Sequence, residues 1–155
     1  MTHFKPRQIL IAHGVNLDLL GRREPHIYGT LSLADIEAQI RQASPVLAAM
    51  VGIDAPYLTC FQSNDEAIFL QKLSESWDGA IVNAGAWTHT SLALGDRLAG
   101  LELPFVEVHL SNLAKREAFR HHSYSAPSAI GVCYGFGAAS YLSGLLGLYA
   151  YFAKQ

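Results

Sequence analysis

A short apolar run that ends in histidine and glycine, QILIAHG (residues 8–14), indicates the fold class of this chain. Near-continuous apolar runs of this length predict strands that are buried on both faces of a sheet. Similar runs recur along the chain and alternate with longer amphipathic or apolar stretches that predict helices. The expected strands are Gln8–His13, Tyr57–Phe61, Gly79–Asn83, Phe105–His109 and Ala129–Tyr134, and the expected helices are Leu33–Ala49, Asp65–Trp77, Leu92–Gly100 and Ala138–Ala153.

Alternation of buried strands with helices predicts a parallel sheet that is covered by helices on both faces. Five strands in 155 residues indicate one flavodoxin-like, doubly wound α/β domain over residues 1–155, with the strand order 2-1-3-4-5. Ligands of such sheets bind beyond the carboxyl ends of the strands, near the change in strand order. Polar chemistry should therefore follow the first, third and fourth strands.

The composition excludes several classes of protein. Apolar residues make up 50% of the chain and charged residues 15%, which argues against a disordered protein or a solvated coiled coil. A net charge of −2 does not suit a general nucleic-acid binder, and there is no polybasic run for a membrane surface. Cys60 and Cys133 stand alone, so they indicate neither a disulfide framework nor a zinc motif, and we expect a reducing, cytoplasmic location.

The segment from Ala126 to Ala153 carries no charge and is long enough for a membrane span. Its five glycines and Pro127 instead favour a buried strand followed by a buried helix. A helix that is apolar on most faces needs cover from its own sheet or from another subunit. We therefore expect a homo-oligomer and no membrane association.

Local signals place the helix boundaries. Ser32 and Asp35 have the spacing of a capping box at the start of the first long helix. Pro45 is expected to bend or split that helix. Asn64 is expected to cap the second long helix, and Ser91 or Thr90 the third.

Polar residues gather after the three strands named above. They lie in residues 13–29 (HGVNLDLLGRREPHIYG), in residues 83–91 (NAGAWTHTS), and in residues 109–123, which contain HLSN and RHHS. The first of these loops is long, as active-site lids often are. In the fourth strand, period-two alternation places Glu107 and His109 on one face, where a buried carboxylate needs a partner. We expect these two residues to share a polar network, which has either a catalytic role or a structural role in connecting the fourth strand to a helix.

Several familiar catalytic motifs are missing from the sequence. It contains neither G-x-S-x-G nor H-E-x-x-H, and GFGAAS (residues 135–140) follows the last strand rather than the first, which favours close packing over phosphate binding. The remaining acids and bases are Tyr28, His89, His109 and Glu107, accompanied by arginines 22, 23, 116 and 120. This set suits an anionic small molecule and proton transfer without a cofactor or a metal. Tyrosine acts as a base only as a phenolate, which guanidinium groups favour; spacing alone also allows a packed aromatic at position 28.

Five blocks, in order, make the chain resemble the type II 3-dehydroquinate dehydratases, a flavodoxin-like family. They are NLxLLGxREPxIYG (residues 16–29), FQSN (61–64), THTS (88–91), EVHLSN (107–112) and RExFRHHSY (116–124). Together these blocks are far more specific than any one of them. The resemblance implies removal of water from 3-dehydroquinate to give 3-dehydroshikimate, by anti elimination through an enolate, in the shikimate or quinate route.

The resemblance also implies roles for individual residues, carried over by position. Tyr28 would take the C2 proton, and Arg23 would hold it as a phenolate. His109 would protonate the departing C1 hydroxyl, and Glu107 would orient that histidine. Asn16 would help to stabilise the enolate, through a water molecule.

Further positions would bind the substrate. Asn83, His89 and Arg120 fall where the family holds substrate hydroxyls. The backbone amides of Leu110 and Ser111 would receive the substrate carboxylate.

Two more positions concern the lid and the assembly. Arg116 falls on a family arginine that supports the lid. Asp96 falls where the family reaches into a neighbouring subunit's site, which implies a dodecamer built as a tetramer of trimers. The resemblance implies no cofactor and no metal.

The chain departs from the family pattern at six positions, which are His13, Val15, Asp18, Ala84, Trp87 and Gly95. These changes leave open a weakened carboxylate-binding protein that keeps the fold and assembly. The fold alone would also allow a flavin-binding module.

Overall fold

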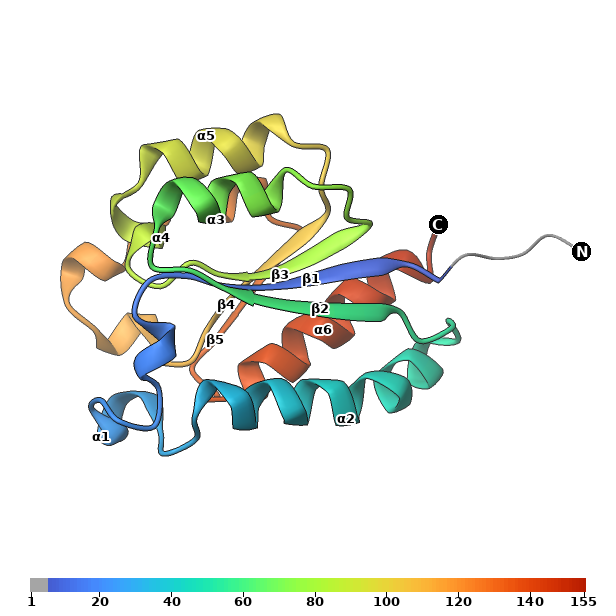
Figure 1. Cartoon of the computed structure of the whole chain (residues 1–155), viewed down its shortest axis with the longest axis horizontal. Helices are drawn as coiled ribbons and strands as arrows, with labels where there is room; N and C mark the ends of the chain where they lie inside the picture. The colour runs from blue at the N-terminus through green and yellow to red at the C-terminus, as the bar shows by residue number, and fades with distance from the viewer. Residues whose placement is uncertain (1–5) are drawn as a thin grey trace, which may run out of the picture.

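The computed structural model describes residues 6–155 and contains a five-stranded parallel sheet between two layers of helices (Figure 1). The strands are β1 (Gln8–His13), β2 (Tyr57–Gln62), β3 (Gly79–Asn83), β4 (Phe105–His109) and β5 (Gly131–Tyr134). They lie in the order β2-β1-β3-β4-β5, and all pairs are parallel. The predicted flavodoxin-like topology is therefore confirmed.

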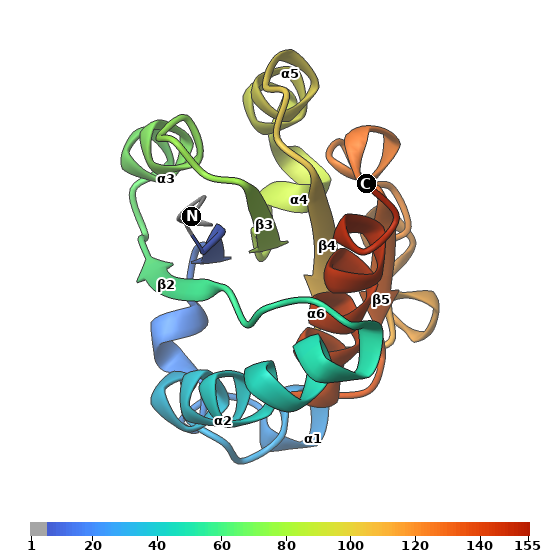
Figure 2. The ribbon, with the colours of Figure 1, turned by 90° about the vertical axis from the view of Figure 1, so that its right-hand side faces the viewer.

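Two long helices cover each face of the sheet (Figures 1 and 2). Helices α2 (Leu33–Val51) and α6 (Ala139–Phe152) pack on one face, and α3 (Glu66–Leu73) and α5 (Leu92–Gly100) pack on the other. The connections contain short helices, which are α1 (Pro25–Tyr28) and α4 (Trp87–Thr90), and 3-10 turns at Leu17–Leu19, Leu113–Lys115, Ala118–Arg120 and Ala126–Ser128.

Burial on both faces explains why the central strands are apolar without alternation. In β1, Ile9 and Ile11 belong to the core under α2 and α6, whereas Leu10 and Ala12 belong to the core under α3 and α5. All four side chains have no exposed surface. Polar groups on these strands are therefore largely restricted to their ends, where the loops begin.

The edge strand β5 differs from the predicted strand in both length and burial. It was expected to begin at Ala129, but the residues around Pro127 form a 3-10 turn and the strand begins at Gly131. Val132 and Tyr134 each remain 40% exposed. The strand has a neighbour on one side only, because β4 is its single partner within the described sheet.

Helix α2 continues through Pro45 without a break, so a split of the helix there, one of the two predicted outcomes, is wrong. Pro45 lies on the exposed side of the helix, where the Arg41 carbonyl that loses its amide donor can face solvent. On the other side, Ser44 and Ala48 are buried and keep the helix against the core. The packing of Ser44 and Ala48, which precede and follow Pro45 in the sequence, therefore outweighs the cost of the hydrogen bond that the proline removes.

Helix caps follow the predictions at α2 and α5 but not at α3. The Ser32–Asp35 capping box is present, and the Ser91 hydroxyl accepts the Leu94 amide hydrogen bond at the start of α5. Asp65, rather than Asn64, caps α3.

Helix α3 is also shorter than predicted, because it ends at Leu73 instead of reaching Trp77. After the helix, the Trp77 indole donates to the Lys72 carbonyl, which holds the chain in a turn.

Helix α6 approaches the sheet closely at Gly144. A Cβ atom at this position would lie 2.7 Å from Val108 Cγ2 and 3.3 Å from Val106 Cγ1. The glycine therefore lets the helix backbone pack against β4. Among residues 6–155, no helix combines the length and the apolar character that a membrane crossing requires.

Gly144→Ala should lower the free energy of unfolding by about 1–3 kcal/mol, because the added methyl group overpacks the core. Gly147→Ala is the matched control on the same helix, since a Cβ there meets nothing within 4 Å. That control should be neutral or stabilising by up to about 1 kcal/mol through helix propensity. Chemical denaturation of the two variants measures both effects, and equal stability of the two would contradict this account of Gly144.

Candidate active site

The loops after β1, β3 and β4 line one cavity at the carboxyl ends of the strands. Ten of the twelve residues predicted for the site line it, which leaves only Glu107 and Asp96 outside its wall. The lining residues are Val15, Asn16, Leu17, Leu20, Arg23, Tyr28, Asn83, Gly85, Ala86, His89, His109, Leu110, Ser111, Leu113, Arg116 and Arg120.

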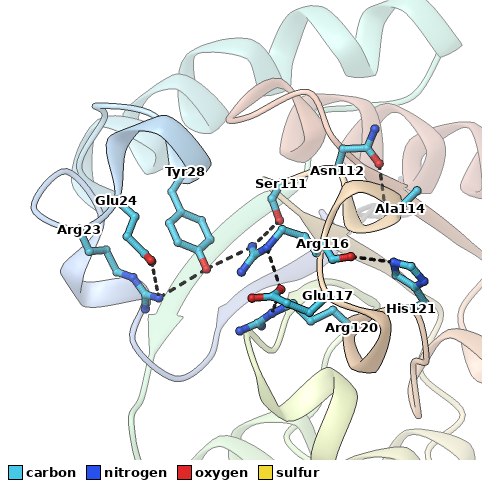
Figure 3. A network of polar contacts seen from close by, with 10 residues as sticks. All are labelled: Arg23, Glu24, Tyr28, Ser111, Asn112, Ala114, Arg116, Glu117, Arg120 and His121. Atoms are coloured by element: carbon cyan, nitrogen blue, oxygen red, sulfur yellow. Dashed lines mark hydrogen bonds and ion pairs between the residues drawn. The ribbon is translucent and has the colours of Figure 1, made fainter.

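Tyr28 lies between two guanidinium groups, as Figure 3 shows. Arg23 Nη2 and Arg116 Nη1 each lie 3.4 Å from the phenol oxygen, and their guanidinium carbons lie 4.7 Å and 5.5 Å from the ring centre. Tyr28 is the last residue of helix α1, which begins at Pro25 and is followed by Gly29 with φ of +84°. Both guanidinium groups are therefore placed to donate a hydrogen bond to the phenol oxygen.

Arg116 connects the loop after β4 to the loop after β1. Its Nη1 atom also donates to Ser111 Oγ at 3.1 Å, and its Nε atom donates to Glu117 (Figure 3). Partial burial would lower the pKa of Arg116, but its contacts with Tyr28 and Glu117 outweigh burial and raise it. The arginine therefore stays charged beside the phenol.

His109 is oriented by a carboxylate behind it. Its Nε2 atom donates to Glu107 Oε1 at 2.8 Å, since an ionised carboxylate can only accept. Glu107 Oε2 accepts hydrogen bonds from Ser123 at 2.7 Å and from Ser125 at 2.5 Å. Glu107 thus lies behind the cavity wall, and the expected network with His109 is present.

The same contacts determine the charge of Glu107, which is 1% exposed. Burial by itself would raise the pKa of this carboxyl. The hydrogen bond and charge of His109, together with the hydroxyls of Ser125 and Ser123, outweigh burial and lower it. The network therefore holds a buried negative charge against the imidazole of His109.

His89 comes from α4 and stacks near His109, with ring centres 5.8 Å apart. Burial lowers the pKa of His89, although its bond to the His122 carbonyl opposes this shift. A neutral His89 must donate from Nδ1 to that carbonyl, which lies 2.7 Å away. Its Nε2 atom is then a hydrogen-bond acceptor.

Asn16 is held in the left-handed region, with φ of 65°. Its backbone amide donates to Asn64 Oδ1 at 2.7 Å, and Gln62 Nε2 donates to the Gly14 carbonyl at 3.2 Å. The loop after β2 was interpreted as a turn and helix cap, but it also supports the loop after β1. The sequence signal for this support was the polar side chain of Asn64, which follows the strand that neighbours β1.

The loops after β1 and β3 touch through their backbones. The Gly14 amide donates to the Asn83 carbonyl at 2.7 Å. A Cβ at Gly14 would lie 2.4 Å from the Ala84 carbonyl oxygen, so only glycine fits here. This contact brings Asn16 and Asn83 to the same cavity.

Tyr141 is a supporting residue that the sequence patterns did not indicate. It is fully buried at the start of α6, and its hydroxyl contacts His13 Nδ1 at 2.8 Å and Asn83 Nδ2 at 3.0 Å. The one available signal was its polar tip inside an apolar helix, because buried tyrosine hydroxyls usually find partners.

Two further predicted residues differ in their surroundings. Arg120 lines the cavity, and its Nε atom donates to Glu117 Oε2 at 3.0 Å. Asp96 is exposed on α5 and does not line the cavity of its own chain.

Two departures from the family pattern have local explanations. Trp87 packs against Phe69, with ring centres 5.4 Å apart. At Gly95, a Cβ would lie 2.7 Å from the Tyr124 carbonyl oxygen, so a longer side chain would displace the segment after β4.

His13, Glu37 and Cys60 form the one cluster of potential metal ligands in the described part of the chain, with ligand atoms within 4.8 Å of one another. Burial, together with the Glu37 carboxylate, raises the pKa of Cys60 to about 11, so the thiol keeps its proton. The positive charge of Arg41 acts on both Glu37 and Cys60. Within this cluster, His13 Nε2 and Glu37 Oε1 form a contact of 3.4 Å.

The cavity brings together two separate proton-transfer groups. One is a phenol beside two guanidinium groups, and the other is an imidazole paired with a buried carboxylate. Such a pair can remove a proton from one atom of a small molecule and deliver one to another.

Comparison with known proteins agrees with this geometry. Residues 7–149 match the family model described as Dehydroquinase class II. A 3-dehydroquinate dehydratase of Gloeothece citriformis is 48% identical over 149 residues, covering 94% of this chain and 93% of the relative. A 3-dehydroquinate dehydratase of a Nostoc species is 48% identical over 150 residues, covering 95% and 97%.

A solved structure also matches the fold. The crystal structure of a type II dehydroquinase from Butyrivibrio crossotus superposes with a TM-score of 0.82 at 34% identity, covering 92% of this chain and 97% of that one. The match in sequence and fold runs along almost the whole described chain and confirms the resemblance. This chain belongs to the class II dehydroquinase family.

Proposed function

We propose that this chain is a single-domain 3-dehydroquinate dehydratase that needs no cofactor. It removes water from 3-dehydroquinate by anti elimination through an enolate and gives 3-dehydroshikimate. One observation carries the proposal: the phenol of Tyr28 and the imidazole of His109 line the same cavity. The family membership supports the choice of substrate.

In the first step, the Tyr28 phenolate takes the proton from C2 of the substrate, next to the ketone. The C–H electron pair moves into the carbonyl, which becomes an enolate. Arg23 and Arg116, each 3.4 Å from the phenol oxygen, stabilise the phenolate before this transfer. Asn16 stabilises the enolate oxygen through a water molecule.

In the second step, the enolate collapses, the C1–C2 double bond forms and the bond from C1 to its hydroxyl breaks. His109 delivers a proton to the departing oxygen, so that water leaves. Glu107 accepts the other imidazole N–H at 2.8 Å and thereby keeps the ring in one orientation. Proton transfer from Tyr28 and to His109 then restores the starting state.

The substrate is held by groups on three loops. Asn83, His89 and Arg120 bind its hydroxyls, and the backbone amides of Leu110 and Ser111 receive its carboxylate. Neutral His89, whose Nδ1 donates to the His122 carbonyl, offers Nε2 as an acceptor for a hydroxyl proton.

The assembly is proposed to be a dodecamer made of four trimers. Asp96 would reach the cavity of a neighbouring subunit, which is supported by its exposed position on α5. Leu92 on the same helix is 61% exposed, and an apolar side chain of this kind suits a subunit contact. We propose a cytoplasmic location and a role in the shikimate or quinate route.

Tyr28→Phe should reduce kcat by about 10²–10⁴-fold, because the base is lost, while substrate affinity changes only a few-fold. Absorbance of the enone product measures turnover, and calorimetry measures binding. Tyr57→Phe is the control, since Tyr57 lies 61% exposed at the start of β2, at the opposite end of the sheet. Near-normal turnover of Tyr28→Phe would mean that another group is the base. A parent chain that binds substrate but forms no enone would leave only the carboxylate-binding alternative.

Arg120→Ala should weaken substrate binding about 10–100-fold, the equivalent of about 1.5–3 kcal/mol for hydrogen bonds from a charged donor. Calorimetric titration with 3-dehydroquinate measures the change. Arg7→Ala serves as the control, because Arg7 contacts Phe152 and is not among the cavity residues. Unchanged affinity of Arg120→Ala would remove this arginine from the proposed binding group.

Glu107→Gln should reduce the acid sensitivity of the fold. The pKa of Glu107 is lower in the folded chain than its unfolded value of about 4.3. Its charge therefore contributes stability that is fully present above that value and is lost as pH falls through the folded pKa. Thermal unfolding between about pH 3 and 6 should show a smaller acid-dependent loss for Glu107→Gln than for the parent. The exposed-carboxylate control Glu75→Gln should follow the parent, and identical profiles for all three would refute this role of Glu107.

A further inference from the structure

His13 and Asn83 lie side by side at the ends of two neighbouring strands. They are register partners in the β1–β3 pair. They follow Ile11 and Ile81 by two residues, so they share the face that α6 covers. Tyr141 of α6 reaches both, at 2.8 Å from His13 Nδ1 and 3.0 Å from Asn83 Nδ2. All three residues are at least 97% buried, so water does not compete freely for these contacts.

The direction of each hydrogen bond in this group follows from a fixed donor. The Gly85 backbone N–H donates to Asn83 Oδ1 at 3.2 Å, which identifies the oxygen of the amide. Asn83 Nδ2 must then donate to the Tyr141 hydroxyl. The hydroxyl keeps its own proton, which it can donate to His13 Nδ1 when that ring nitrogen is unprotonated.

In that tautomer the imidazole proton of His13 is on Nε2, which faces the Glu37 carboxylate. Nε2 and Glu37 Oε1 are 3.4 Å apart, a loose contact, and Nε2 has no closer hydrogen-bond partner among the described residues. The chain of donors runs from Asn83 to Tyr141, then to His13 and Glu37. A doubly protonated His13 would leave the Tyr141 proton without an acceptor.

These hydrogen bonds limit which donor or acceptor atoms Asn83 can present to the cavity. Its oxygen is held by Gly85, and one of its two N–H bonds is held by Tyr141. The second N–H is the donor that remains for a bound molecule. An amide rotated by 180° would present its oxygen instead, would lose the hydrogen bond from Gly85, and would need the Tyr141 proton that otherwise faces His13.

We infer that His13 and Tyr141 are positioning residues that fix the Asn83 amide with an N–H toward the substrate. The inference rests on the proposed function, in which Asn83 binds a substrate oxygen. The inference adds that Asn83 favours a substrate group that accepts a hydrogen bond over one that donates. His13 belongs to the departures from the family pattern, so the histidine end of this arrangement is a feature of this chain.

Tyr141→Phe tests the inference, with Tyr149→Phe as a closely matched control. Both tyrosines are fully buried on α6, and the Tyr149 hydroxyl bonds Ser44 Oγ at 2.7 Å, remote from the lining of the cavity. Each variant loses one buried hydroxyl, which has two partners at Tyr141 and one at Tyr149, so both should lose thermal stability, and Tyr141→Phe somewhat more. Only Tyr141→Phe should lower kcat/KM, by about tenfold, mainly through a higher KM. Equal kcat/KM for both variants, measured where both are folded, would overturn the inference.

A double-mutant cycle with Asn83→Ala tests whether Tyr141 acts through Asn83. In the Asn83→Ala background, Tyr141→Phe should cause no further loss of kcat/KM, because the group it positions is gone. Additive losses would show that Tyr141 acts by another route.

A third measurement needs no turnover and so separates this inference from the proposed function. Neutron or atomic-resolution crystal structures, which distinguish the amide oxygen from the NH₂ group, should show the Asn83 amide rotated or in two conformers in Tyr141→Phe but not in the parent. An Asn83 side chain with an unchanged rotamer in Tyr141→Phe would overturn the inference even if the enzyme is active. If the parent instead forms no enone, the proposed function fails while this structural comparison still holds.

Discussion

The site depends above all on one buried carboxylate, that of Glu107. It is 1% exposed and accepts hydrogen bonds from His109, Ser123 and Ser125. The histidine lies two residues along the same strand, whereas the serines lie beyond the segment of short 3-10 turns that carries Arg116 and Arg120. The one charge therefore orients the imidazole of His109 and anchors the far end of the loop that contributes the two arginines. Removing it would leave three polar partners facing a buried site without an acceptor.

The anchored loop in turn supports the loop after β1. Arg116 holds both Ser111, at the end of β4, and the phenol of Tyr28. From the other side, Gln62 and Asn64 hold the backbone at Gly14 and Asn16. Side chains that lie far apart in the sequence are thus brought to one cavity by the parallel sheet, whose strands all end on the same side.

Much of the fold could be predicted because its strongest signal is simple. Strands such as β1 are buried on both faces, so their sequences are unbroken apolar runs. The order of the strands follows from the fold class. Local signals were less reliable where tertiary contacts compete with them. The helix continues through Pro45 because Ser44 and Ala48, which precede and follow it, are buried against the core. Asn64 accepts a hydrogen bond from the Asn16 amide instead of capping α3.

The site likewise contains residues that could be predicted from the sequence and residues that could not. Ten of the sixteen residues that line the cavity could be named from the strand ends and from five sequence blocks, because each of the ten lies in a polar segment. Tyr141, which lies under Asn83, was not predicted, because a tyrosine in an apolar helix looks like any other core residue until its hydroxyl partners are known. Supporting residues of this kind depend on contacts across 58 and 128 positions of the chain, which no local pattern encodes.

The open side of β5 has a practical consequence for protein engineering. Val132 and Tyr134 are 40% exposed on a strand whose outer backbone groups have no partner strand in the described sheet. A variant designed to remain a single subunit would present this edge to other molecules and invite strand-to-strand aggregation. Such a design would need a lysine or a proline on β5 to block that pairing.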